Sequence, residues 1–136
     1  MTGKLLSVFV MFIILTSVSV GALPLAFAGI PGAAPTGLNN SAPSTSTSIF
    51  LQWTAPGDDG GEAITGYKIE QAPELSFDNF GSYTVLVANT ESSSTTHTVS
   101  GLSSGDFFKF RVSAINASGS GTTSNEFMIG PQKEQQ

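Results

Sequence analysis

Few residues in this chain of 136 could carry out chemistry. His97 is the only histidine, so a Ser-His-Asp hydrolase would have to use it as the general base. Its parity with Val99 in a predicted short strand places it instead at the edge of a core, and no strand-to-helix turn is predicted that could hold a nucleophile. A hydrolase centred on His97 is therefore kept only as an alternative, and no catalytic residue is assigned.

Three acidic side chains lie close together in the sequence at Asp58, Asp59 and Glu62. Carboxylates are calcium ligands, but calcium takes about six to eight oxygens, and the sequence lacks the Asp-x-Asp-x-Asp spacing of calcium loops. The Asp-Asp-Gly-Gly run that contains two of the acids is ordinary turn chemistry. We therefore predict no metal site, and no pattern in the chain implies a cofactor.

Large apolar residues gather in and next to a segment that Pro73 and Gly81 predict to be irregular. An exposed aromatic platform can stack on sugar rings or hold a protein partner. The alternative is that these side chains cap the open end of the fold, as satellite clusters under long loops do. Burial of both Phe77 and Phe80 would remove the binding interpretation. The cluster consists of Leu75 and of the three candidate partner-binding residues Phe77, Phe80 and Tyr83.

Charge and cysteine content exclude further classes of function. The sequence holds five bases and ten acids, which gives a formal net charge of −5. Nucleic acid is not expected as a partner, because phosphate binding needs clustered Lys and Arg that the chain lacks. Without cysteine there is neither a disulfide nor a thiolate nucleophile, so stability must come from packing and hydrogen bonds.

The first 28 residues have the composition of an export signal. Lys4 is their only charge, the range 5–20 is apolar, and the triplet Ala-Phe-Ala at 26–28 is of the kind that signal peptidases cut after. We expect cleavage after Ala28, which leaves 108 residues with four bases, ten acids and a net charge of −6. The alternative is a retained anchor, because the uncharged span is long enough to cross a bilayer, which needs about 20 residues. In either case the remaining chain is predicted to be secreted or held at the cell surface.

The rest of the chain is organised around the stretch 107–116, whose side chains alternate with a period of two. One face carries apolar residues, namely Phe108, Phe110, Val112 and Ala114. Lys109, Arg111 and Ser113 take the other face, so the stretch is predicted to be a strand with one side in a core and the other in water.

Other segments also carry strand and turn signals. Leu38 is the first residue expected to be anchored, and Phe50 breaks the alternation of its strand by facing outward. About seven short strands without helical periodicity describe an antiparallel β-sandwich in a single domain. The domain is predicted over 34–130, with a linker over 29–33 before it and a polar tail over 131–136 after it. Its further strands are predicted over 46–53, 66–70, 83–87, 96–100 and 126–129. The loops are predicted over 54–62, 71–82, 89–95 and 117–124.

Two stretches resemble a known family, the fibronectin type III domains. The range 53–61 reads Trp-Thr-Ala-Pro-Gly-Asp-Asp-Gly-Gly and 64–70 reads Ile-Thr-Gly-Tyr-Lys-Ile-Glu, which resembles the second strand, loop and third strand of that family. The second match is Leu-Ser-Ser-Gly at 102–105 followed by Arg-Val-Ser-Ala-Ile-Asn at 111–116. The resemblance implies a seven-stranded immunoglobulin-like β-sandwich and says little about function.

The chain departs from the family pattern at two positions. Phe108 stands where the family usually has a tyrosine whose hydroxyl bonds back to the preceding turn, and Ser104 replaces the turn proline. The Arg-Gly-Asp of integrin-binding members is absent from the sequence, so adhesion of that kind is not expected. The core that the resemblance implies consists of Trp53, Tyr67, Ile69, Leu102, Phe108, Phe110 and Val112.

The function expected from the sequence is a non-catalytic exported module that mediates extracellular or cell-surface contacts or acts as a spacer. Its partner would be an extracellular protein or a glycan, and a monomer is expected. A carbohydrate-binding module using the exposed aromatics is one alternative, and the His97 hydrolase is the other. Asn39 and Asn116 begin acceptor tripeptides for N-glycosylation, which matter only in an organism that glycosylates exported proteins.

Overall fold

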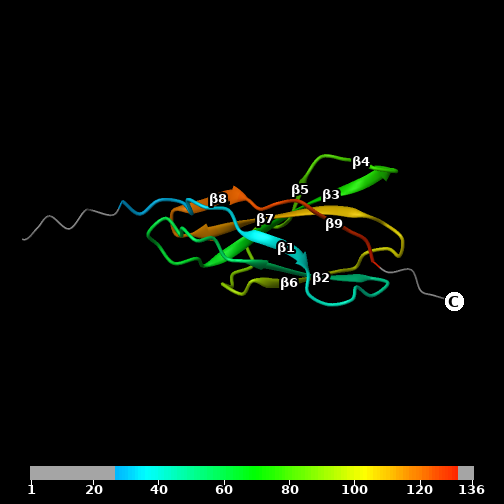
Figure 1. Cartoon of the computed structure of the whole chain (residues 1–136), viewed down its shortest axis with the longest axis horizontal. Helices are drawn as coiled ribbons and strands as arrows, with labels where there is room; N and C mark the ends of the chain where they lie inside the picture. Colours follow the sequence, from blue (N-terminus) through cyan, green and yellow to red (C-terminus); the bar gives the residue numbers. More distant parts are fainter. Residues whose placement is uncertain (1–26, 132–136) are drawn as a thin grey trace, which may run out of the picture.

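The computed structural model describes residues 27–131, and their regular structure is entirely β (Figure 1). In that range no helix is long and apolar enough to span a membrane. Most of the predicted leader and nearly all of the polar tail lie outside the described residues. In chain order the strands are β1 (Thr36–Asn40), β2 (Ser48–Thr54), β3 (Gly66–Ser76), β4 (Asn79–Phe80), β5 (Thr84–Val87), β6 (Thr96–Ser100), β7 (Phe108–Asn116), β8 (Gly119–Thr123) and β9 (Phe127–Ile129).

The strands form two antiparallel sheets that pack face to face as two layers (Figure 1). The smaller sheet has the order β1-β2-β6. The larger has the order β4-β3-β7-β8, with β5 also pairing with β3 and β9 also pairing with β7. The predicted all-β sandwich is therefore confirmed. Of the nine strands in the described range, three fall outside the predicted strand ranges, namely β1, where only Leu38 was expected to be anchored, β4 and β8.

Both strands with strong alternation form as predicted. The inner faces of β2 and β7 supply Ile49, Leu51, Trp53, Phe110 and Val112, which are all buried. The prediction fails for Ser113, which was expected to face water and is fully buried. In register it lies between Lys68 of β3 and Thr123 of β8, so the longer side chains of both neighbours shield this short one.

The range 71–82 was predicted to be irregular, but β3 continues through it to Ser76 and turns back into β4. Proline is tolerated where a strand does not need its N–H. At Pro73 the ladder uses the carbonyl instead, which accepts the N–H of Gly81 at 2.8 Å, and the next N–H, from Glu74, donates to Phe107 O at 2.8 Å. The proline therefore does not break the strand.

The glycine-serine range 117–124 was predicted to be a flexible loop, but most of it is β8. The long strand β7 offers a free edge, and Ser113, Ile115 and Asn116 pair there with Thr123, Ser120 and Gly119. These backbone bonds offset the conformational entropy that a glycine-rich segment loses on ordering. Composition predicts the flexibility of such a segment and gives no sign of the edge that orders it.

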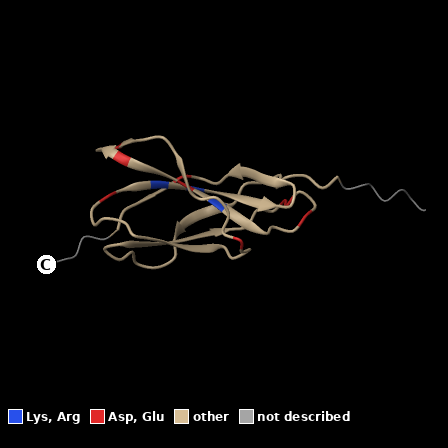
Figure 2. Ribbon diagram, turned by 180° about the vertical axis from the view of Figure 1, so that it is seen from behind, with Lys and Arg blue, Asp and Glu red and all other residues tan. Residues whose placement is uncertain are grey.

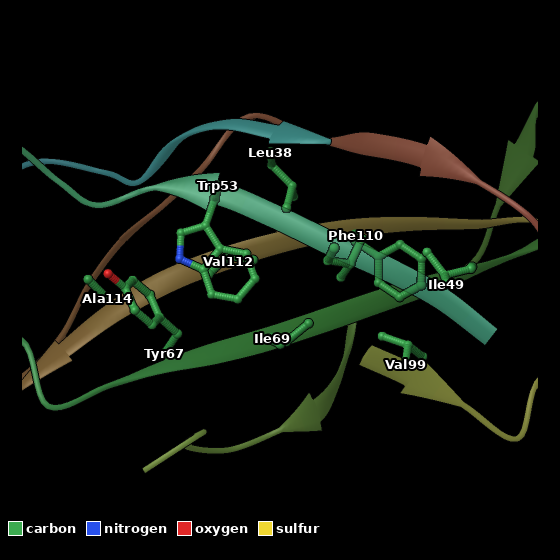
Figure 3. Close-up of a cluster of buried hydrophobic side chains, with 10 residues drawn as sticks. Leu38, Ile49, Trp53, Tyr67, Ile69, Val99, Phe110, Val112 and Ala114 are labelled. Atoms are coloured by element: carbon green, nitrogen blue, oxygen red, sulfur yellow. The ribbon is translucent and has the colours of Figure 1, made fainter. Parts of the chain in front are cut away.

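The core lies between the two sheets and is centred on an aromatic pair. Trp53 of β2 meets Tyr67 of β3 edge-on, with ring centroids 5.0 Å apart (Figure 3). Of the seven residues that the resemblance placed in the core, five are buried, while Leu102 and Phe108 are partly buried against the cluster. Every member of this cluster falls between Leu38 and Ile129, so the domain closes its core without the residues ahead of it.

The range 29–33 was predicted to be a linker, but it packs on the domain. Pro31 is fully buried, and the N–H of Gly29 donates to Gly60 O at 2.8 Å. The carbonyl of Gly29 accepts the side-chain amide of Asn116 at 2.7 Å. Small residues and prolines are typical of linkers, and here they allow the chain to lie close to the loop after β2.

Candidate functional site

The outer face of the larger sheet carries the three bases of the described range, on the paired strands β3 and β7 (Figure 2). Arg111 donates twice to Glu70, from Nε at 3.1 Å and from Nη2 at 3.2 Å. Lys68 lies 3.6 Å from the same carboxylate, and Lys109 lies 3.7 Å from Glu126. The hydrogen bonds from Arg111 are the main reason why the pKa of Glu70 lies below its ordinary value.

Two of the three candidate partner-binding aromatics contribute to this charged face. The guanidinium carbon of Arg111 lies 4.0 Å from the ring centroid of Tyr83, and Nζ of Lys109 lies 4.6 Å from that of Phe80. Both rings are partly buried, and burial is the main cause that raises the pKa of Tyr83. Because each ring has a cation over its face, the two do not form a free platform for stacking on a sugar.

The third aromatic, Phe77, is 98% exposed at the tip of the β3–β4 hairpin. Leu75 of the same hairpin is 68% exposed, and Phe107, whose carbonyl accepts the N–H of Glu74, is 44% exposed. Asp78 takes the left-handed conformation, with φ at 57°, and its N–H donates to the side chain of Glu74 at 3.0 Å. The hairpin tip is therefore a defined turn that presents two large apolar side chains to solvent.

His97 lies at the edge of the smaller sheet and is partly buried. Burial lowers its pKa, and no hydrogen bond joins it to an acid or a hydroxyl within residues 27–131. The range 101–105 has the pattern Gly-x-Ser-x-Gly, which is the sequence pattern of a nucleophile elbow. In the structure it is the turn between β6 and β7, with no helix after it, so its serine is not held as in such an elbow.

A shallow hollow of about 390 Å³ lies beside Phe50, the outward-facing aromatic of β2. Its other lining residues are Leu51 of β2, Ser41 just after β1, and Thr96, His97 and Thr98 of β6. Its lining contains no acid, lysine or arginine. The hollow brings together no set of groups that would activate a nucleophile or bind a metal.

The acids Asp58, Asp59 and Glu62 are used in local structure. Oδ1 of Asp58 accepts the N–H of Gly60 at 2.9 Å, and Oδ1 of Asp59 accepts the N–H of Gly61 at 2.9 Å. Glu62 accepts the hydroxyl of Ser118 at 2.9 Å. No group of three potential metal ligands gathers here or elsewhere in the described part of the chain.

The two glycosylation candidates differ in accessibility. Asn39 lies on β1, partly buried, with its side chain bonded to Gly37 O and to Gln52. Asn116 is buried, and its Nδ2 donates to Gly29 O and Asp59 O, both at 2.7 Å. In the folded domain these two hydrogen bonds occupy the side-chain amide of Asn116, and glycosylation at Asn39 or Asn116 stays a prediction.

An antiparallel sandwich with this strand order defines an immunoglobulin-like β-sandwich protein, as the resemblance implied. Within that class the chain belongs to the fibronectin type III family. The family model described as fibronectin type III domain matches residues 33–129, which is most of the chain. Domains of this family are commonly protein-interaction or spacer modules and are generally non-catalytic.

Solved structures agree with this assignment. Domains A168–A170 of titin are 27% identical over 76% of this chain, with a TM-score of 0.63, and the kinase region of twitchin from C. elegans is 22% identical over 79%, with a TM-score of 0.66. The match spans only 33% of the titin chain and 18% of the twitchin chain. The fourth fibronectin type III domain of a human protein is 22% identical, with 78% of this chain and 83% of that chain covered and a TM-score of 0.60.

Proposed function

We propose that this protein is an exported, non-catalytic fibronectin type III module that makes protein contacts outside the cytoplasm through the tip of its β3–β4 hairpin. The observation that carries the proposal is the near-complete exposure of Phe77 beside the exposed Leu75. Neither side chain belongs to the hydrophobic core or packs against it. Export is supported by the apolar leader and by the Ala-Phe-Ala triplet before Gly29.

Protein contact is favoured over glycan binding by the state of the neighbouring rings. Sugar recognition would use the flat faces of several aromatics, but the faces of Phe80 and Tyr83 are engaged by Lys109 and Arg111. An isolated Phe77 next to an aliphatic residue suits a pocket on a protein partner. Burial of the two side chains would contribute about 1.5–3 kcal/mol each to binding. A module without such a partner would act as a spacer.

Site-specific photocross-linking tests the contact. A benzoylphenylalanine is placed at Phe77 or at Val85, an exposed apolar residue of β5 that serves as the matched control. We expect a discrete adduct in the producing cells from position 77 and not from position 85, and we expect Leu75→Ser to abolish it. The same adducts from both positions, or none from position 77, would contradict the contact proposal.

Export is tested separately by the mass and N-terminal sequence of the protein recovered from the medium or cell surface. We expect a chain that begins at Gly29. Recovery of the protein in the cytoplasm alone would refute export, and an intact leader on the exported chain would mean that the apolar segment remains as an anchor.

A further inference from the structure

Gly29, the first residue after the predicted cleavage bond, is held by hydrogen bonds to Gly60 and Asn116, and we call this position between the two residues the seat. Its N–H donates to Gly60 O at 2.8 Å, and its carbonyl accepts Nδ2 of Asn116 at 2.7 Å. Ala28 and Phe27, the two residues before it, are exposed, Phe27 by 91%. The Ala28–Gly29 bond is thus the boundary between exposed and docked chain.

The seat is closed from several sides. Gly60 has a left-handed φ of 77°, and an added Cβ there would collide with the carbonyl oxygens of Gly29 and Ile30. Pro31 is fully buried, and a Cβ on Gly121 of β8 would lie 2.6 Å from its carbonyl oxygen. The chain therefore has little room to move at Gly29, so an amino group on this residue would have a defined position.

The seat is also acidic. The loop that supplies Gly60 carries Asp58, Asp59 and Glu62, and none of the three is in a salt bridge within residues 27–131. The bases of that range form ion pairs with Glu70 and Glu126 on the outer face of the larger sheet. The other groups around the seat, Asn116 and the strand β8, carry no charge. A cation at Gly29 would therefore lie next to a loop whose three carboxylates accept only neutral hydrogen bonds within residues 27–131.

We propose that the amino group released by cleavage after Ala28 docks in this seat as the charged N-terminus of the mature protein. The proposal rests on the export and cleavage proposed above. Hydrolysis of the Ala28–Gly29 amide consumes one water, whose oxygen completes the carboxylate of Ala28. The nitrogen of Gly29 leaves as an amine and is protonated at neutral pH. The bond to Gly60 O then becomes charge-assisted, which makes it shorter and stronger than a neutral one.

Docking has a consequence for titration. Hydrogen bonding and nearby carboxylates favour the ammonium form, so the pKa of this amino group should lie above the ordinary range of about 7.7–8.0. A group whose pKa is raised by folding stabilises the fold fully below its unfolded pKa, and that stability is lost as the pH rises through the folded pKa. The added stability is therefore complete at neutral pH and absent in alkali.

The test compares three chains that end at Gln136 and begin at Ala28, Gly29 or Ile30, each released from a cleavable fusion. At pH 7 we expect the Gly29 chain to melt roughly 4 °C above the Ala28 chain, in which the charge is displaced by one residue. The Ile30 chain, which lacks both hydrogen bonds of Gly29, should melt lowest. The difference between the first two chains should vanish as the pH approaches 10. Equal melting temperatures for these two chains from pH 6 to 10 would overturn the proposal.

Matched variants test the electrostatic cause. Asp58→Asn and Asp59→Asn keep the side-chain oxygens that accept the N–H groups of Gly60 and Gly61, and they remove only the charges. Together they should lower the pKa of the amino group, measured by NMR of Gly29. Asp106→Asn removes one charge beyond the far end of β7 and should leave this pKa unchanged. An exported product that starts elsewhere would refute the cleavage site, while the result from the Gly29 chain would still decide whether the seat exists.

Discussion

Arg111 and Glu70 face each other in register on β7 and β3 and are joined by two hydrogen bonds, of 3.1 and 3.2 Å. The guanidinium also lies over the ring of Tyr83, just before the edge strand β5. One side chain of the central strand therefore ties three neighbouring segments together on the outer face. Such bidentate pairs add geometric specificity as well as energy.

Glu70→Gln should destabilise the domain in a pH-dependent way. Hydrogen bonding from Arg111 lowers the pKa of Glu70 below its ordinary value of 4.5. The stability that the pair contributes is therefore present above pH 4.5 and is lost as the pH falls through the folded pKa. We expect the substitution to cost about 1.5–3 kcal/mol at pH 7 and progressively less as the pH falls through the folded pKa, measured by urea denaturation. Glu126→Gln, at the more exposed pair with Lys109, should cost at most about 1 kcal/mol.

Trp53→Ala should unfold the domain or nearly do so. The ring is buried at the centre of the core and packs edge-on against Tyr67. Removal of a buried Trp costs about 3–5 kcal/mol, against a typical net stability of about 5–15 kcal/mol. Loss of the cooperative thermal transition would show it. Phe77→Ala removes an exposed ring and should change the free energy of unfolding by less than about 0.5 kcal/mol.

Phe108→Tyr should stabilise the domain by about 1 kcal/mol. Phe108 is partly buried at the start of β7, directly after the turn 103–106, and in related domains a tyrosine at this position bonds back to the turn. One added intramolecular hydrogen bond accounts for the gain. Phe107→Tyr places the same hydroxyl on the exposed neighbour and should leave the denaturation midpoint unchanged. Equal midpoints for both variants would show that no partner is within reach of position 108.

The sequence predicts the sandwich because several strands alternate clearly, as β2 and β7 do. It does not predict β8 or the second half of β3, because these segments are ordered by pairing with neighbouring strands, β7 for β8 and both β4 and β7 for β3, which composition does not indicate. Ser113 shows the same limit. Its parity is correct, but its burial depends on Lys68 and Thr123, the residues paired with it on the two neighbouring strands.

The candidate site shows this limit more strongly. Phe77, Phe80 and Tyr83 are equivalent candidates in the sequence, and only the structure separates them. Lys109 and Arg111 lie 29 and 28 residues after Phe80 and Tyr83 in the sequence, and they reach these two rings across the sheet. The seat of Gly29 was also missed, since a range of small residues and prolines indicates a linker.

Asn116→Ala should destabilise the domain more than any other substitution of a polar residue considered above. Its side chain donates to Gly29 O and Asp59 O and accepts the N–H groups of Ser118 and Gly119, at 2.7–3.1 Å. Alanine leaves these four backbone groups without that partner. A buried polar group that loses its partner costs about 1–3 kcal/mol, so we expect a loss of at least about 2 kcal/mol in urea denaturation.

Two further variants separate the hydrogen bonds of Asn116 from simple side-chain loss. Asn116→Asp keeps the acceptor oxygen but turns a negative charge toward two carbonyl oxygens, so it should be about as unstable as the alanine variant at pH 7. Its carboxyl should have a raised pKa in the folded state, because the protonated form can again donate to a carbonyl. Stability should therefore return as the pH falls toward 4, opposite to the trend of the wild type at Glu70. Asn39→Ala, in the other glycosylation tripeptide, removes only two less buried bonds, and a loss as large as that of Asn116→Ala would contradict the special role of Asn116.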